Sequence, residues 1–258
     1  MTSARFSAGI HAVARLLDED PGRVRRLLVD RRVDNERISG LLESAGGAGV
    51  AVERVARNRL DALAAGTRHQ GVVAELRGAS SLDEAALRTL VEERLTAGGA
   101  VLLLVLDGVQ DPHNLGACLR TADAAGVDAV IIPRRHAAGI TPAVRKVATG
   151  AAESVPLARV ERLARVIDWL HDYGVRVIGT ADDADAGLYE ADLTGPVALV
   201  LGGEERGMAA AVAERCDAVI AIPMAGSVES LNVSVAAGVC LYEACRQRRS
   251  IASAPGLG

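Results

Sequence analysis

The sequence predicts an α/β protein whose larger, C-terminal part folds around a parallel sheet. From residue 100 onward, continuous apolar stretches alternate with helical patterns. Strands that are apolar on both sides need helices on both faces of their sheet. Residues 1–78 alternate shorter helical and strand patterns, which predict a small α/β unit. Half of the 258 residues are hydrophobic and only 2% are aromatic, so aliphatic side chains must fill both cores.

The N-terminal unit, residues 1–78, is expected to begin with a helix at 10–17. Strands are expected at 27–29, 50–52 and 72–73. This unit carries 13 Arg against 10 acidic residues, whereas the rest of the chain has a net charge of −7. Because the whole chain has a net charge of −4, it cannot bind nucleic acid through an overall positive charge alone. The local excess of +3 fits either a solvated surface or contact with RNA.

Residues 79–99 are expected to form a partly helical linker, residues 100–249 the main domain, and residues 250–258 a frayed tail. The predicted buried strands of the main domain are 100–106, 129–132, 175–179, 197–201 and 218–222. The sequence shows no internal repeat that would indicate another architecture.

Several classes of protein are disfavoured. The apolar stretch at 100–106 is far shorter than the ~20 residues that span a bilayer, and polar residues interrupt the N-terminus where a signal peptide would need an apolar run. We therefore expect a cytoplasmic protein without membrane contact. The four cysteines have neither C-x-x-C spacing nor a histidine at zinc-ligand spacing. We therefore expect buried free thiols and no metal site.

The strand at 100–106 is followed by Asp107-Gly108-Val109, not by the G-x-G-x-x-G of dinucleotide sites. A nicotinamide oxidoreductase is therefore disfavoured. The sequence also has no P-loop and no G-x-S-x-G elbow. Polar residues instead follow three apolar strands, at the carboxyl ends where open α/β sheets bind ligands.

The first of these segments, 105–132, contains a helical pattern with an apolar stripe. Arg120 projects away from that stripe and so avoids the core. Asn114 stands near the predicted start of the helix, where it is either a functional residue or the N-cap.

The second segment, LVLGGEERGM at 199–208, ends a strand in two glycines and Glu204. Glycines allow backbone to approach a ligand closely, and a tight turn with solvated acids is the alternative. The third segment, 222–244, has a loop and then a helix that is apolar on nearly every face and so must be buried in the core or at a subunit interface. Ser230 and Asn232 open this helix, and N-capping by Ser230 competes with a functional role.

Taken together, the segments DPHNLGACLR, LVLGGEERGM and IPMAGSVESLNVSVA resemble the three motifs of the SpoU (TrmH-type) family of RNA ribose 2′-O-methyltransferases. With GAAESVP at 150–156, the chain is most similar to the branch that methylates a guanosine of 23S ribosomal RNA. GIHAV at 9–13 and HQGVVA at 69–74 resemble the N-terminal RNA-binding domain of that branch.

The resemblance implies a SPOUT-type methyltransferase domain with a deep trefoil knot that forms the S-adenosylmethionine pocket. It also implies a homodimer, with the final helix contributing to the interface, and 23S ribosomal RNA as partner. Transferred by motif position, the catalytic residues are Asn114, Arg120, Glu204, Ser230 and Asn232, and the cofactor contacts are Gly202, Ile222 and Leu231.

The implied chemistry removes a proton from the ribose 2′-hydroxyl as its oxygen attacks the methyl group. The family proposal gives this proton to Arg120, although arginine side chains lose a proton only above about pH 12. Alternatively, Arg120 positions a phosphate or stabilises the developing alkoxide.

Two related functions remain open. A transfer RNA ribose methyltransferase of the same fold would share the catalytic motifs, but the N-terminal unit favours ribosomal RNA. A catalytically silent RNA-binding assembly factor is the other alternative, and the presence of all five motif residues argues against it.

Overall fold

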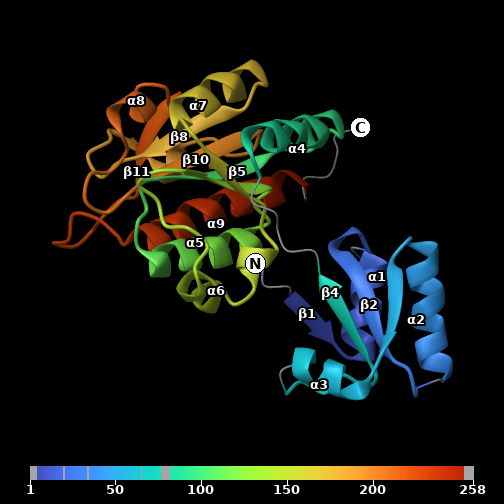
Figure 1. Cartoon of the computed structure of the whole chain (residues 1–258). Helices are drawn as coiled ribbons and strands as arrows, with labels where there is room; N and C mark the ends of the chain where they lie inside the picture. Colours follow the sequence, from blue (N-terminus) through green and yellow to red (C-terminus); the bar gives the residue numbers. More distant parts are fainter. Residues whose placement is uncertain (1–4, 20, 34, 65, 77–81, 253–258) are drawn as a thin grey trace. The chain divides into compact units, whose positions relative to one another are not determined.

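The computed structural model describes residues 5–19, 21–33, 35–64, 66–76 and 82–252 (Figure 1). The chain divides into two compact units, Met1–Gly78 and Ala79–Gly258. Each unit is described by itself.

The N-terminal unit is a four-stranded sheet in the order β1-β4-β2-β3, with β2 and β3 parallel and the other pairs antiparallel. Its elements are β1 (Arg5–Ala8), α1 (Ile10–Glu19), the 3₁₀ turn η1 (Pro21–Arg23), β2 (Val24–Asp30), α2 (Glu36–Gly47), β3 (Ala51–Val55), α3 (Arg57–Ala64) and β4 (Val72–Leu76).

Helices cover both faces of this sheet. Leu27 and Val29 of β2 pack with residues of α1 and α2, whereas Leu28 packs with residues of α3. This alternation follows from the two-residue period of a strand. Asn35 starts α2 by accepting a hydrogen bond from the Ile38 N–H, 3.1 Å.

The C-terminal unit is built around a seven-stranded sheet in the order β7-β6-β5-β10-β8-β11-β9, and every pair is parallel. Its elements are α4 (Glu84–Thr96), β5 (Leu102–Asp107), α5 (Pro112–Ala125), β6 (Ala129–Pro133), α6 (Pro142–Ala148), η2 (Ala151–Glu153), β7 (Leu157–Val160), α7 (Leu163–Asp172), β8 (Arg176–Thr180), β9 (Ala186–Gly187), η3 (Leu188–Glu190), β10 (Val197–Gly202), α8 (Ala210–Ala213), β11 (Ala218–Ala221) and α9 (Val233–Ala252).

The predicted parallel sheet with helices on both faces is confirmed. Helices α5, α6 and α9 lie on one face, and α4, α7 and α8 lie on the other (Figure 1). In β5, Leu104 and Leu106 face the first group while Leu103 and Val105 face the second, so the strand is buried on both sides.

Two segments pack more closely than their names suggest. The segment 79–99, expected to be a partly helical linker, contains helix α4, whose Leu87 and Val91 are fully buried in the core of the C-terminal unit. Residues 79–81 of that segment lie outside the described residues. The expected tail at 250–258 begins as the last turn of α9, and residues 253–258 are not described.

Candidate functional site

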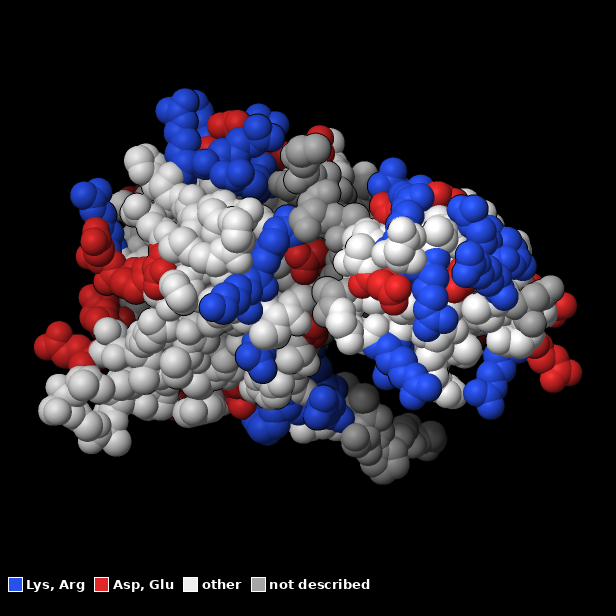
Figure 2. All heavy atoms as spheres, turned by 60° about the horizontal axis from the view of Figure 1, so that its bottom comes forward, with Lys and Arg blue, Asp and Glu red and all other residues white. Residues whose placement is uncertain are grey.

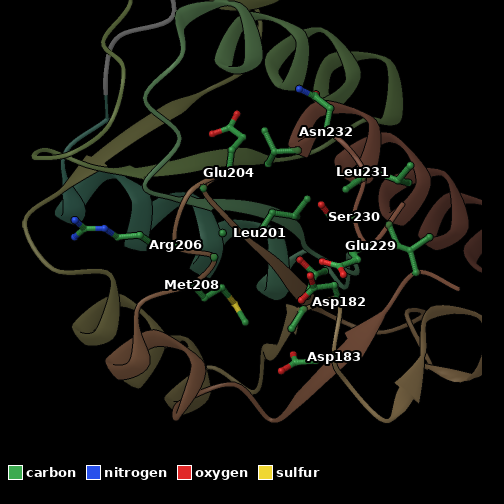
Figure 3. Close-up of a pocket in the computed structure, with 18 of the residues that line it drawn as sticks. Asp182, Asp183, Leu201, Glu204, Arg206, Met208, Glu229, Ser230, Leu231 and Asn232 are labelled. Carbon is green, nitrogen blue, oxygen red and sulfur yellow. The ribbon is translucent and has the colours of Figure 1, made fainter. Parts of the chain in front are cut away.

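A cavity of about 810 Å³ lies at the carboxyl ends of β8, β10 and β11 (Figure 3). The segments 180–183, 201–208 and 229–233 supply most of its lining, and Ala236 of α9 completes one side. Small-molecule sites typically enclose about 300–1,000 Å³. The second and third segments singled out in the sequence therefore meet at one cavity of ligand size.

The loop after β10 folds back tightly on the end of its own strand. The Gly207 N–H donates to the Gly203 carbonyl oxygen, 3.0 Å, and Gly207 has a φ of 62°. A Cβ on Gly202 would lie 2.1 Å from the Gly207 carbonyl carbon, and one on Gly203 would lie 2.5 Å from the Gly108 oxygen. Both glycines are thus required where backbone meets backbone in this tight turn, and their close approach to a ligand stays a prediction.

The end of β5 holds this loop in place. Gly202 pairs with Asp107 in the parallel register of β10 and β5. The Gly203 N–H donates to the Asp107 carbonyl oxygen, 2.8 Å, and the Asp107 carboxylate accepts from the Ala209 N–H, 2.7 Å. The first and second segments are therefore fixed to each other by backbone hydrogen bonds.

Asn114 lies in the first turn of α5 and faces the other motif residues. Asp111 is the N-cap, since its carboxylate accepts from the His113 N–H, 2.9 Å, and Pro112 occupies the first turn. The alternative in which Asn114 caps the helix is therefore wrong. Its side-chain amide donates to the carboxylate of Glu204, and its oxygen accepts from Asn232 Nδ2, 3.0 Å.

Asn232 is itself held by the start of α9. Its side-chain oxygen accepts hydrogen bonds from the Ser234 N–H, 2.9 Å, and from the Ser234 hydroxyl, 2.6 Å. Asn232 therefore caps α9, and capping by Ser230 is wrong. Ser230 lines the cavity, and its hydroxyl has no hydrogen-bond partner in the described part of the chain. The result is a directed chain of side chains, from Ser234 through Asn232 and Asn114 to Glu204.

The residues expected to contact a cofactor, Gly202, Ile222 and Leu231, all line the cavity. Arg120 does not. It is exposed on α5, and among the described residues it makes no hydrogen bond or ion pair. Four of the five expected catalytic residues are brought to the cavity or its hydrogen-bonded rim, and Arg120 is not joined to them.

The end of β8 contributes residues that the sequence interpretation missed. Thr180, the last residue of β8, lines the cavity together with Asp182 and Asp183, which follow the strand and are labelled in Figure 3. The strand was predicted at 175–179, and polar residues at its carboxyl end were the available signal. The acidic residues of the lining outnumber its single arginine, Arg206: they are Asp182, Asp183, Glu204, Glu205 and Glu229. This lining favours a ligand that carries positive charge.

Other chemistry is not indicated by the described residues. No group of three or more His, Cys, Asp or Glu side chains among them could hold a metal ion. Burial, together with the carboxylate of Glu204, raises the pKa of the Cys118 thiol to about 12. Cys118 therefore stays neutral and does not act as a nucleophile. No helix in the described ranges is long and apolar enough to span a membrane.

Known families and proteins match the chain over most of its length. Residues 101–242 match the profile of the SpoU rRNA Methylase family, and residues 8–82 match the profile described as RNA 2′-O ribose methyltransferase substrate binding. The chain is 50% identical over 250 residues to the 23S rRNA (guanosine-2′-O-)-methyltransferase RlmB of Coxiella burnetii, covering 97% of this chain and 98% of the relative. The protein of the same name from Yersinia pestis is 49% identical over 240 residues, 93% of this chain and 96% of its own.

Solved structures give the same assignment. The SpoU methyltransferase AviRb from Streptomyces viridochromogenes, in complex with the cofactor AdoMet, superposes with a TM-score of 0.62 at 30% identity over 95% of this chain and 90% of its own. An AdoMet-bound rRNA methyltransferase from Sinorhizobium meliloti gives 0.62 at 26% identity over 95% and 88%. The profile match covers more than half of the chain, and the relatives cover nearly all of it. The chain therefore belongs to the SpoU family of RNA methylases.

Proposed function

We propose that the protein transfers a methyl group from S-adenosylmethionine to the ribose 2′-hydroxyl of a guanosine in 23S ribosomal RNA. The observation that carries this proposal is the convergence of three distant motif segments on one cavity, through the hydrogen bonds that join Asn114, Glu204 and Asn232. The relatives named 23S rRNA (guanosine-2′-O-)-methyltransferase are about 50% identical to this chain over almost its whole length. Because these relatives are bacterial and ribosomal RNA is cytoplasmic in bacteria, we also propose that the protein acts in the cytoplasm.

The cavity fits the proposed cofactor in size and charge. S-Adenosylmethionine carries two positive groups, a sulfonium and an ammonium, against one carboxylate, and the lining has five acidic side chains against one arginine. Gly202, Ile222 and Leu231 are proposed to hold it, with the turn at Gly207 closing one wall. When bound, the cofactor supplies an electrophilic methyl group.

The linked side chains are proposed to position the target ribose beside this cavity. Asn114 and Asn232 each hold neighbours with both ends of their side-chain amides, so their orientations are set before substrate arrives. Preorganised polar groups lower the cost of stabilising charge that develops during reaction. Ser230 has an unengaged hydroxyl at the cavity and is proposed to contact the ribose or an adjoining phosphate.

Arg120 is proposed to hold an anionic group of the RNA. Its guanidinium is exposed and without a described partner, so its donors are available for a phosphate or for the developing alkoxide. Removal of the 2′-hydroxyl proton by Arg120 is the competing role. If Arg120→Ala retains wild-type turnover while Arg249→Ala, which removes another exposed arginine, does the same, both roles are excluded.

The reaction is tested by incubating the pure protein with S-adenosylmethionine and unmodified 23S fragments or transfer RNA, and then measuring modified nucleosides by mass spectrometry. We expect 2′-O-methylguanosine in the ribosomal fragment only. Methylation of transfer RNA alone would overturn the substrate and keep the reaction. Binding of RNA without methylation of either would support the silent assembly factor instead.

We also propose that the protein is a homodimer that pairs through α9. Val235 and Tyr242 on this helix are 50% and 54% exposed, and a spacing of seven residues places them on one face. An apolar stripe on a helix that otherwise packs into the core indicates a contact surface. The trefoil knot stays a prediction of the family resemblance.

Light scattering tests this assembly. We expect a mass of twice the 26.7 kDa of the chain at micromolar concentration. Tyr242→Glu should shift the protein toward monomer, whereas Val52→Glu, at a valine of the N-terminal unit that is 41% exposed, should not. A wild-type monomer would contradict the proposal.

A further inference from the structure

Five arginines gather at one edge of the N-terminal sheet. β2 and β3 are parallel and end at this edge, and β4 begins there because it runs antiparallel to β2. Arg31 and Arg32 follow β2, Arg54 and Arg57 lie at the end of β3 and the start of α3, and Arg68 precedes β4. We call Arg31, Arg32, Arg54, Arg57 and Arg68 the arginine edge.

The side chains of the arginine edge are all exposed. None of them forms an ion pair with an acid in the described ranges, and Arg54 donates only to the Val33 carbonyl oxygen, 3.3 Å. Figure 2, in which the bottom of Figure 1 comes forward, shows cations gathered over the face of this unit. Their charge is therefore available to a partner.

Other arginines of the same unit are neutralised away from this edge. Arg25 contacts the carboxylate of Glu75, 2.9 Å, and Arg59 contacts that of Glu53, 2.7 Å. Arg26 bridges the two carboxylates, lying 2.8 Å from Glu53 and contacting Glu75 as well. Two acids thus compensate three arginines by direct contact, while the arginine edge has no such compensation.

Few acids oppose the arginine edge. Asp30, at the end of β2, is 1% exposed, and its carboxylate accepts from the Arg32 N–H, 3.0 Å. Asp61 of α3 accepts from His69 Nε2, 2.9 Å. Glu36, in the first turn of α2, and Asp61 are the exposed acids near these strand ends within the described ranges. The balance of charge at the edge is therefore positive.

Residues 69–71, which follow Arg68, form a turn that is held by side-chain hydrogen bonds. Gln70 has a φ of 52°, and its neighbour Gly71 has a φ of 89°. His69 fixes the turn, since its Nδ1 accepts from the Gly71 N–H, 3.0 Å, while its Nε2 contacts Asp61. Non-glycine residues in this backbone region are costly and collect at functional sites.

The two N-terminal motifs meet at this turn. The side-chain oxygen of Gln70 accepts from the Ile10 N–H, 3.3 Å, and the Gly9 N–H donates to the Val72 carbonyl oxygen, 3.2 Å. GIHAV at 9–13 is thereby joined to HQGVVA at 69–74. Gln70 is exposed, and its side-chain amide nitrogen has no hydrogen-bond partner among the described residues, so it is a free donor close to Arg68 in the chain.

We propose that the arginine edge and the Gln70 turn form the surface that holds the phosphate backbone of the RNA substrate. This inference rests on the proposed function and adds where the RNA contacts the N-terminal unit. Arginine forks match phosphate oxygens, and release of counterions from RNA drives such binding. Because Phe6 is the one Phe, Tyr or Trp in the sequence of residues 1–78, stacking of bases on such rings is not an alternative source of affinity here.

The test compares two double variants of the full-length protein. Arg31→Gln/Arg68→Gln removes two charges from the arginine edge. Arg25→Gln/Arg59→Gln removes two charges from the same unit and leaves Arg26 to hold both Glu75 and Glu53. Binding of a 23S fragment is measured by fluorescence anisotropy over a range of KCl concentrations, and S-adenosylmethionine binding is measured by calorimetry as a folding control.

We expect the edge variant to reduce the slope of log K against log salt by about 1.4 and to weaken RNA binding roughly tenfold at 0.15 M salt, since each phosphate contact contributes about 0.7 to the slope. The matched variant should stay within about twofold of the wild type, and both should bind the cofactor normally.

Equal losses in the two variants would show an effect of bulk charge and overturn the proposal. Unchanged RNA binding in the edge variant would overturn it as well. If the edge variant bound the RNA fragment normally but had lost binding to ribosomal particles, the edge would hold a protein partner, which would also overturn the proposal. Binding is measured without methyl transfer. If RNA binding by the wild type depends on this edge but the wild type methylates neither the 23S fragment nor transfer RNA, the proposed function is refuted and this inference stands.

Discussion

Gly202 is the position where the cavity wall leaves least room for change. It ends β10, and a Cβ there would lie 2.1 Å from the carbonyl carbon of Gly207 and 2.3 Å from the Met208 nitrogen. Carbon atoms in contact lie about 3.5 Å apart, so Gly202→Ala must displace the 203–208 loop or β10 by more than about 1 Å. Both neighbours are backbone atoms, which no change of rotamer can move.

The size of the effect follows from the cost of overpacking, about 1–3 kcal/mol. If the strain remains in the folded protein, Tm should fall by about 2–12 °C. If the loop moves instead, the same energy appears as a loss of S-adenosylmethionine affinity of about 5- to 150-fold, since 1.4 kcal/mol is tenfold. The two losses together should account for the strain.

Calorimetric titration with S-adenosylmethionine and thermal unfolding measure the two parts. Gly226→Ala is the matched control, because its Cβ would have no heavy atom within 4 Å although the residue lies in the loop before α9. The control should keep wild-type affinity and Tm. A Gly202→Ala protein that keeps both as well would refute the close approach on which this reasoning depends.

Three further changes test other contacts. Asn114→Asp places a carboxylate against that of Glu204 and should lower the single-turnover methylation rate about 10- to 100-fold, since a hydrogen bond to a charged group contributes about 1.5–3 kcal/mol. Adding Glu204→Gln to this variant should recover part of the rate. No recovery would argue against direct contact between the two side chains. Hydrogen bonds from Arg246 and Gln247 lower the pKa of Glu243 from 4.5 to about 2, so its stabilisation is complete above pH 4.5 and is lost as the pH falls toward 2. Wild-type Tm should therefore fall over that range more steeply than that of Glu243→Gln, and parallel curves would contradict this. Burial raises the pKa of both Cys118 and Cys240 to about 12, so iodoacetamide at pH 8 should label them only after unfolding, as read by mass spectrometry; rapid labelling of native protein would show that these thiols are accessible.

The centre of the larger sheet could be predicted from sequence because its strands are apolar on both faces. The stretches at 100–106, 129–132, 175–179, 197–201 and 218–222 correspond to β5, β6, β8, β10 and β11. The strands that were not predicted, β1, β7 and β9, all lie at the edges of their sheets. Edge strands are short and partly solvated, so their sequences carry a weaker apolar signal; β7, for example, includes Arg159.

The site was predictable in its residue types and less so in its local geometry. The signal for the true cap of α5 was present, since Asp111 precedes Pro112 and proline favours the first helical position. The chain of contacts from Asn232 to Glu204 could not be derived from local pattern, because Asn114 lies 90 residues from Glu204 and 118 from Asn232. They come together because β5 lies beside β10 in the sheet, and because the chain before α9 runs back to the ends of these strands.

The division within the motif residues bears on how the proposed reaction is promoted. Asn114, Glu204 and Asn232 are fixed to one another in the absence of substrate, whereas Arg120 is exposed and unattached among the described residues. This exposure leaves its planar donors available for an anion, as the proposed electrostatic role requires. Under that role Arg120→Lys should retain part of the rate with an unchanged pH profile, and a profile displaced toward lower pH by this substitution would favour the base instead.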